Sequence, residues 1–284
     1  MPHSSKTRVA RECVQPEAEI PRRSILTAAK RAERALAARS RPAGDFDASR
    51  YFRGTPDLGF YNVGTPIVRQ MAKSLVVEHP EWMLRDAMIF ADRLIESRYL
   101  ESKALACFVV ARYQRDFSPP LLARWKGWLA RGNAANWATT DAICGCLIGP
   151  LLIRHRSLTP RVAAWAGDRN LWVRRASAVG LIPLLRRGRE LDAAYRVARR
   201  LQDDREDLIQ KAVGWMLREA GKADVPRLER YLRRGGAHIP RTTLRYAIER
   251  FPPSRRTALL AATKGASSRG QRNLAARRFS KKRI

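Results

Sequence analysis

Small residues recur at a fixed interval along this chain, inside short strings that are similar to one another. The strings centre on Ala72, Ala106, Ala176, Ala212 and Ala247, so successive separations are 34, 70, 36 and 35 residues. The separation of 70 is two intervals of 35. A unit of about 35 residues is the length of one helix pair in the stacked arrays called α-solenoids. The repeat therefore predicts an all-α fold, an α-solenoid of about six HEAT-like helical repeats.

The rest of the sequence between 45 and 263 also has helical character. Ala and Leu dominate, apolar residues follow the period of a helix, and prolines interrupt the pattern at intervals that suit one or two helices. Pro150 and Pro183 lie inside apolar runs, where a proline can kink a helix rather than end it. A generic helical bundle with accidental alanine spacing is the alternative to the solenoid. Small residues at one register position favour the solenoid, because they allow close contact with the neighbouring helix.

Positive charge is spread over the whole chain. Lys and Arg number 56 against 26 Asp and Glu, a formal net charge of +30. Residues 1–44 contribute +6 and residues 264–284 contribute +8, which leaves +16 on residues 45–263. We interpret 1–44 as a basic extension with a helix over 23–40, 45–263 as the repeat domain, and 264–284 as a flexible basic tail. A folded body with this charge favours a polyanion such as DNA as its partner.

Composition and motifs exclude several other classes. A hydrophobic fraction of 45% argues against disorder. The sequence has no apolar run long enough for a transmembrane helix, no secretory signal at its start, and only four cysteines, too few for a disulfide scaffold in a chain of this length. We therefore expect a soluble cytoplasmic protein, acting as a monomer. No metal or cofactor is expected, since zinc spacing, a Walker loop and a strand-borne GxGxxG are all missing.

One repeat differs from the other five. The third unit has Asp141 where the others have alanine. A buried acid without a partner is costly, so its presence indicates either function or a satisfied core network. Trp137 lies one turn earlier on the same helix face. In the next two units Arg175 and Lys211 precede the repeat alanine, and Arg174 adjoins Arg175. Stacking the repeats should bring these cations close to one line with Asp141.

Structural explanations compete with functional ones for these residues. Asp141 could simply pair with Arg175, and basic side chains on a positive solenoid most often make general phosphate contacts. Trp215 lies one turn beyond Lys211, but tryptophan on a helix rich in Ala and Leu is usually core. We interpret four other tryptophans as core: Trp82, Trp125, Trp128 and Trp165.

Five ordered strings resemble AlkD-type DNA glycosylases, the alkylation-repair family built of HEAT-like repeats. The resemblance covers about residues 45–262. The strings are SRYFRGTPDLGFYNVGTPIVR (49–69), NWATTDAICGCLIGPLL (136–152), NLWVRRASAV (170–179), DLIQKAVGWMLREAGK (207–222) and PRTTLRYAIERFP (240–252).

The resemblance implies hydrolysis of the N-glycosidic bond of cationic alkylated purines, N3-alkyl-adenine and N7-alkyl-guanine, in duplex DNA without deep base flipping. It implies a cleft lined by Asp141, Trp137, Trp215 and Arg175, with Tyr51 closing it. We expect the first three to be catalytic, and Arg175, Arg174, Lys211 and Tyr51 to contact DNA. The alternative is a non-catalytic solenoid that binds bent, nicked or branched DNA. A protein-binding scaffold is disfavoured by the charge of the body.

Overall fold

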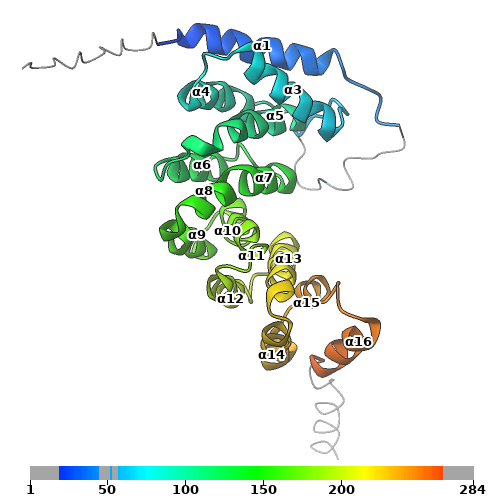
Figure 1. Cartoon of the computed structure of the whole chain (residues 1–284). Coiled ribbons are helices and arrows are strands. Elements are labelled where there is room, and N and C mark those ends of the chain that lie inside the picture. The colour runs from blue at the N-terminus through cyan, green and yellow to red at the C-terminus, as the bar shows by residue number, and fades with distance from the viewer. Residues whose placement is uncertain (1–18, 45–51, 53–56, 265–284) are drawn as a thin grey trace, which may run out of the picture.

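The computed structural model describes residues 19–44, 52 and 57–264. Within these ranges the chain consists of helices and connecting loops and has no strand; two residues, Gly59 and Tyr99, form an isolated β-bridge. The all-α prediction is therefore confirmed. The helices are stacked one above another from α1 to α16, as Figure 1 shows. Among the described helices, none combines the length and the apolar character that crossing a membrane requires.

Six helices form a continuous first row in which each one packs against the next. This row consists of α3 (Thr65–Glu78), α5 (Leu100–Val110), α7 (Trp137–Ile143), α10 (Leu171–Val179), α13 (Asp207–Ala223) and α15 (Arg241–Ala247). The repeat alanines of the sequence lie on these helices, one per helix in all but α7. All five are buried, with Ala106 and Ala176 fully inaccessible. The predicted register is therefore the packing register of the solenoid.

A second row packs on the first. It consists of α1 (Arg22–Ala37), α4 (Leu84–Ile95), α6 (Leu121–Ala130), α9 (Thr159–Ala164), α12 (Leu191–Arg200) and α14 (Val225–Gly235). α4 contacts α5, α6 and α9 contact α10, and α12 and α14 contact α13. Two short helices, α8 (Gly149–Arg154) and α11 (Ile182–Leu185), belong to neither row; α8 follows α7 in the chain and α11 follows α10. The last helix, α16 (Pro253–Ala262), packs on α14. In the described part of the chain each row thus has six helices, in agreement with about six repeats.

The helix expected over residues 23–40 is α1, and it belongs to the packed body. It contacts α4, and its apolar face, which includes Ile25, Ala29 and Leu36, is fully buried. The packed body therefore begins at α1, ahead of residue 45. Residues 1–18 of the expected basic extension and residues 265–284 of the expected tail lie outside the described residues.

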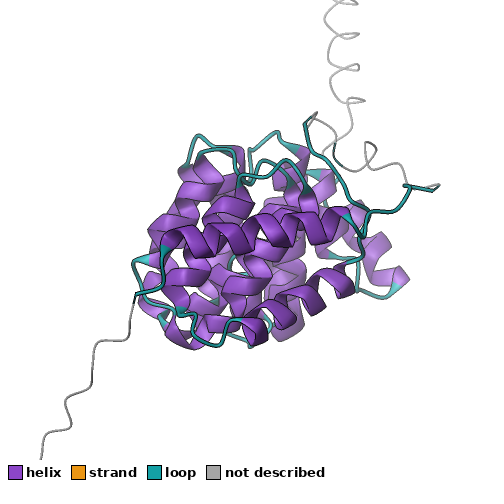
Figure 2. Ribbon diagram, turned by 90° about the horizontal axis from the view of Figure 1, so that it is seen from above, coloured by secondary structure: helices purple, strands orange, loops and turns teal. Residues whose placement is uncertain are grey.

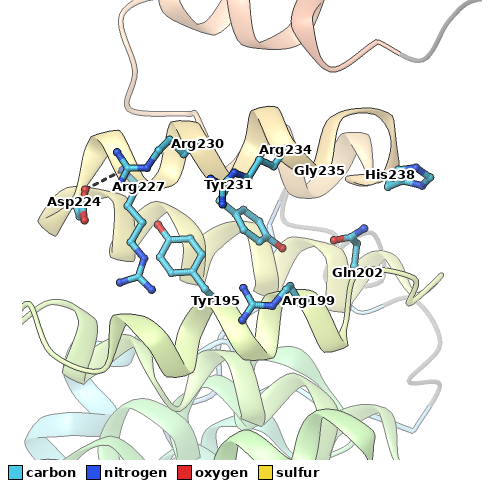
Figure 3. A pocket seen from close by; sticks show the side chains of 10 residues that line it. All are labelled: Tyr195, Arg199, Gln202, Asp224, Arg227, Arg230, Tyr231, Arg234, Gly235 and His238. Carbon is cyan, nitrogen blue, oxygen red and sulfur yellow. Dashed lines mark hydrogen bonds between the residues drawn. The ribbon is translucent and has the colours of Figure 1, made fainter.

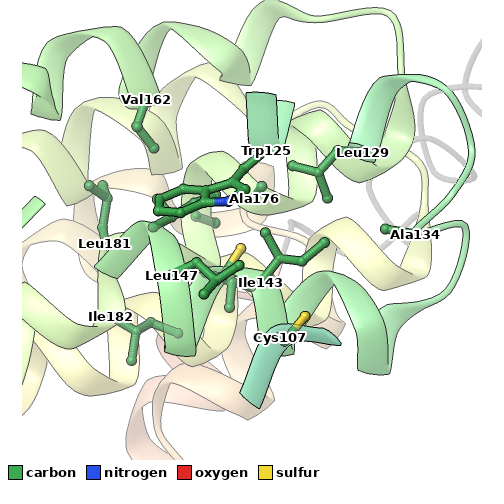
Figure 4. Close-up of a cluster of buried hydrophobic side chains, with 14 of the residues drawn as sticks. Cys107, Trp125, Leu129, Ala134, Ile143, Leu147, Val162, Ala176, Leu181 and Ile182 are labelled. Atoms are coloured by element: carbon green, nitrogen blue, oxygen red, sulfur yellow. The ribbon is translucent and has the colours of Figure 1, made fainter. Parts of the chain in front are cut away.

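The tryptophans interpreted as core are buried. Trp125 and Trp128 are inaccessible to solvent, and Trp82 and Trp165 are 5% and 8% exposed. Figure 4 shows Trp125 packed among apolar side chains from α7, α9 and α10, including Ile143, Val162 and Ala176. The indole of Trp125 thus fills the space between the two rows at the level of α7.

The helical path of α7 continues without a break through a π-helical turn, Cys144–Ile148, into α8. Pro150 is the second residue of α8 and directly follows the π-helical turn. At this position the helix can do without a backbone N–H donor, which proline lacks. A side-chain Cβ on Gly149 would lie 2.3 Å from the Pro183 ring, so this glycine permits the contact with α11. Pro183 itself is near the start of α11 rather than at a kink. The irregular turn begins three residues after Asp141.

Candidate functional site

The start of α7 is held by a buried asparagine. The Asn136 side chain accepts the backbone N–H of Thr139 at 2.8 Å and donates to the Thr139 hydroxyl at 2.9 Å. An N-cap of this kind satisfies N–H groups that have no partner within the helix. Asn136 is 2% exposed, so the cap is part of the core. The cap makes Trp137 the first helical residue and sets Asp141 one turn further on.

Asp141 forms a two-point ion pair with Arg175 on the next first-row helix. The Arg175 Nε donates to one carboxylate oxygen at 2.9 Å and Nη2 donates to the other at 2.8 Å. The remaining terminal nitrogen, Nη1, donates to the backbone oxygen of Leu208 at the start of α13. Arg175 therefore connects three consecutive helices of the first row, and the expectation that stacking brings Asp141 and Arg175 together is confirmed.

The two members of this pair differ in exposure. The Arg175 side chain is 6% exposed, whereas 18% of the Asp141 side chain remains exposed. Burial raises the pKa of the Asp141 carboxyl above its ordinary value, and the Arg175 guanidinium opposes that rise through charge and hydrogen bonding. A bidentate guanidinium favours the ionised carboxylate. The pair therefore presents a carboxylate with residual access to solvent and keeps the cation behind it.

The other two cations predicted as DNA contacts also have protein partners. Arg174 donates from Nε to Asp204 at 2.7 Å and from Nη1 to the backbone oxygens of Asp168 and Arg169. Lys211 pairs with Asp207 at 2.7 Å on its own helix, a contact that raises the pKa of Lys211, and its side chain is 40% exposed. Lys211 is thus the most accessible of the three cations. DNA contacts by all three remain predictions.

The indole of Trp137 is covered by an aromatic side chain from a distant segment. The Phe52 ring stacks on Trp137 with centroids 5.1 Å apart and planes at 7°, and it also contacts Phe60 at 5.3 Å. Phe52 follows Tyr51, the residue expected to close the cleft, which lies outside the described residues. The sequence interpretation did not single out Phe52, although it belongs to the quoted string 49–69. An aromatic next to Tyr51 was the available signal.

Trp215 is half-buried on α13, where it packs against the core. Leu208, which accepts from Arg175, lies two turns before Trp215 with Lys211 between them, so the three share one face of α13. Beside Trp215, a Cβ on Gly214 would lie 2.4 Å from the Tyr246 Cβ, which brings α15 close. Tyr246 is an exposed aromatic that the sequence interpretation missed.

Gly145 leaves open space one turn beyond Asp141. It is exposed, and a Cβ built there would meet no atom within 4 Å. Gly145 lies in the π-helical turn rather than at a position of positive φ, so its lack of a side chain is not required by the backbone. We call the set of Trp137, Asp141, Gly145, Lys211 and Trp215 the Asp141 face; its residues on α7 and its residues on α13 are linked through Arg175. It combines a carboxylate, a cation and two indoles on the first row.

No group of three or more His, Cys, Asp or Glu side chains in the described ranges is arranged to hold a metal ion. The two cysteines near Asp141 differ in exposure: Cys144 is fully buried and Cys146 is partly exposed. Burial raises the pKa of both thiols. Burial keeps both thiols protonated, and both pack with the apolar core.

The fold and the Asp141 face together define an α-solenoid with one carboxylate–guanidinium pair built into a row of otherwise small residues. The family described as DNA alkylation repair enzyme matches residues 32–251, and the chain belongs to that family. A predicted DNA alkylation repair enzyme from Enterococcus faecalis is similar in structure, with a TM-score of 0.64 and 19% sequence identity over 76% of this chain and 98% of that chain. No curated protein matches the sequence.

Proposed function

We propose that this protein is a DNA glycosylase that hydrolyses the N-glycosidic bond of cationic alkylated purines in duplex DNA. The observation that carries the proposal is Asp141: a partly accessible carboxylate where the other repeats have a buried alanine, oriented at both oxygens by Arg175. Membership of a DNA alkylation repair family supports DNA as the substrate. The net charge of +30 supports the same partner.

The chemistry needs little from the protein because the substrate is already activated. A purine alkylated at N3 or N7 carries positive charge, so it leaves as a neutral base when the electron pair of the C1′–N bond moves onto the ring. No general acid is required. The sugar is left with oxocarbenium character, and water adds at C1′ and releases a proton. A carboxylate stabilises that cation and orients the water as a hydrogen-bond acceptor.

Each residue of the Asp141 face has a role in this scheme. Asp141 acts on the sugar and on water. Trp137 and Trp215 stabilise positive charge through the faces of their indole rings. Arg175 is a positioning residue: it fixes the carboxylate and keeps it ionised, since its own nitrogens all donate to protein acceptors. We propose Lys211, Arg174 and Tyr51 as phosphate contacts, with Lys211 the most accessible of the described ones.

The test is incubation of the purified chain with a duplex that carries one N7-methylguanine, scored for abasic sites under single-turnover conditions. A duplex with a neutral lesion such as uracil is the matched substrate, because one carboxylate without a general acid suits only a base that already carries positive charge. We expect abasic sites in the first duplex and none in the second. No abasic sites in either, together with tight binding to nicked or bent DNA, would favour the non-catalytic alternative.

A further inference from the structure

A cavity of about 740 Å³ lies between α12 and α14, in the second row. Figure 3 shows its lining: side chains from both helices face one another across the gap. The residues of the Asp141 face lie on first-row helices and on the π-helical turn, and none of them lines this cavity. The cavity is therefore a separate feature, and the proposed glycosylase chemistry does not use it.

Four arginines line the cavity: Arg199, Arg227, Arg230 and Arg234. Among the described residues, no carboxylate forms an ion pair with Arg199, Arg230 or Arg234. Arg227 pairs with Asp192, and its guanidinium carbon lies 4.5 Å from the centre of the Tyr195 ring. Cations that outnumber the acidic groups around one hollow repel one another, and an anion in the hollow relieves that repulsion.

The acidic side chain in the lining is already engaged. Asp224 is the N-cap of α14, where its carboxylate accepts the backbone N–H of Arg227 at 2.9 Å. Capping uses one of its oxygens and ties the charge to the start of the helix, where the helix dipole favours it. Asp224 therefore offsets only part of the positive charge that the arginines contribute.

A buried hydroxyl in the lining lacks a partner. Tyr195 is 2% exposed, and its hydroxyl has no hydrogen-bond partner among the described residues. An unsatisfied buried donor is rare and costly, so it calls for an acceptor. The Tyr231 ring lies 5.2 Å from the Tyr195 ring. Burial raises the pKa of each phenol to about 12, with nearby arginines opposing the rise, so both hydroxyls stay protonated and able to donate.

We propose that the cavity between α12 and α14 is a phosphate-binding site. The guanidinium fork matches two phosphate oxygens at once, and protonated hydroxyls donate to a third. The ligand chemistry is a phosphate ester or a pyrophosphate. It has two sources: the backbone of a DNA strand that reaches the second row, or a free phosphorylated molecule of nucleotide size, for which the cavity has room.

The test compares two double variants of the full chain that differ only in which arginines they change. Arg199→Gln with Arg234→Gln alters the cavity, whereas Arg196→Gln with Arg233→Gln removes the same charge from the same helices at exposed positions outside it. The probes are inorganic pyrophosphate, measured by calorimetry, and an undamaged duplex, measured by fluorescence anisotropy. Circular dichroism and thermal midpoints check that both variants are folded.

We expect the cavity variant to bind pyrophosphate about tenfold or more weakly than the control variant, since two charge-assisted contacts are lost. A matching loss of duplex affinity in the cavity variant identifies the ligand as the DNA backbone, and an unchanged duplex affinity identifies a free phosphorylated molecule. Equal pyrophosphate affinities in the two variants, or no binding by the unmodified chain, would overturn the proposal.

Discussion

Replacing Asp141 by asparagine tests both the structural and the catalytic interpretation of the ion pair with Arg175. Asparagine keeps the shape but loses the charge, and its amide nitrogen faces a guanidinium nitrogen that can only donate. Removing one partner of a fully buried pair costs about 3–5 kcal/mol. Asp141 keeps 18% of its side-chain exposure, so water compensates in part. We therefore expect the free energy of unfolding to fall by about 2–3 kcal/mol, measured by denaturant titration.

A double-mutant cycle separates the pair from its surroundings. Arg175→Met fills the space of the aliphatic stem and removes the guanidinium. We expect the double variant to lose less stability than the sum of the losses in the two single variants. The difference, which is the coupling energy of the pair, should be about 2 kcal/mol. Additive losses would refute the reasoning, because the two side chains would then stabilise the fold independently.

Excision is the second readout. Loss of a preorganised electrostatic group costs about 10²–10³ in rate, so Asp141→Asn should lower the single-turnover rate on N7-methylguanine by that factor. Asp204→Asn is the matched control, because Asp204 pairs with the neighbouring Arg174 at 2.7 Å and at similar exposure. The control should lose stability and keep its rate at saturating enzyme. Equal rates in the two variants would mean that Asp141 is a structural acid only.

Three further predictions concern pH, access and the tail. Burial raises the pKa of Asp141 and Arg175 lowers it, so excision should fall as pH drops through the folded pKa, and Arg175→Met should move that acidic limb to higher pH; an unmoved limb would exclude Asp141 as the titrating group. Because the pKa of Asp141 is higher in the folded state than in the unfolded chain, the stability that this carboxyl contributes should decrease as pH rises from the unfolded pKa to the folded pKa. Gly145→Leu should leave the thermal midpoint unchanged, since its Cβ meets no atom within 4 Å, while weakening lesion-duplex binding about tenfold; unchanged binding would put the DNA on another face. Deleting residues 264–284 removes eight positive charges, so binding to undamaged duplex should weaken and its salt dependence should become shallower, with the saturated excision rate retained; a collapse of that rate would make the tail part of the active complex.

The architecture and the register could be predicted from the amino-acid sequence alone. Packing of neighbouring first-row helices requires a small residue at one position per repeat, and that requirement is visible as a period of about 35 residues; the alanines that define it are buried, from Ala72 to Ala247. The same period identified Asp141 as the exception and located Arg175 beside it. The period shows which residues face the neighbouring helix, because residues at the same position in each repeat lie on the same buried face of their helices.

Side-chain directions and contacts between distant segments could be seen only in the folded chain. The Arg175 guanidinium donates to Asp141 and to the backbone of α13, because those acceptors lie within reach once α7, α10 and α13 are stacked. Its expected contact with phosphate stays a prediction. Phe52 covers Trp137 from a segment far away in sequence. The arginines of α12 and α14 form one cavity although each helix alone is an ordinary basic amphipathic helix. Long side chains have many rotamers, and which one is occupied depends on neighbours that only the folded chain brings together.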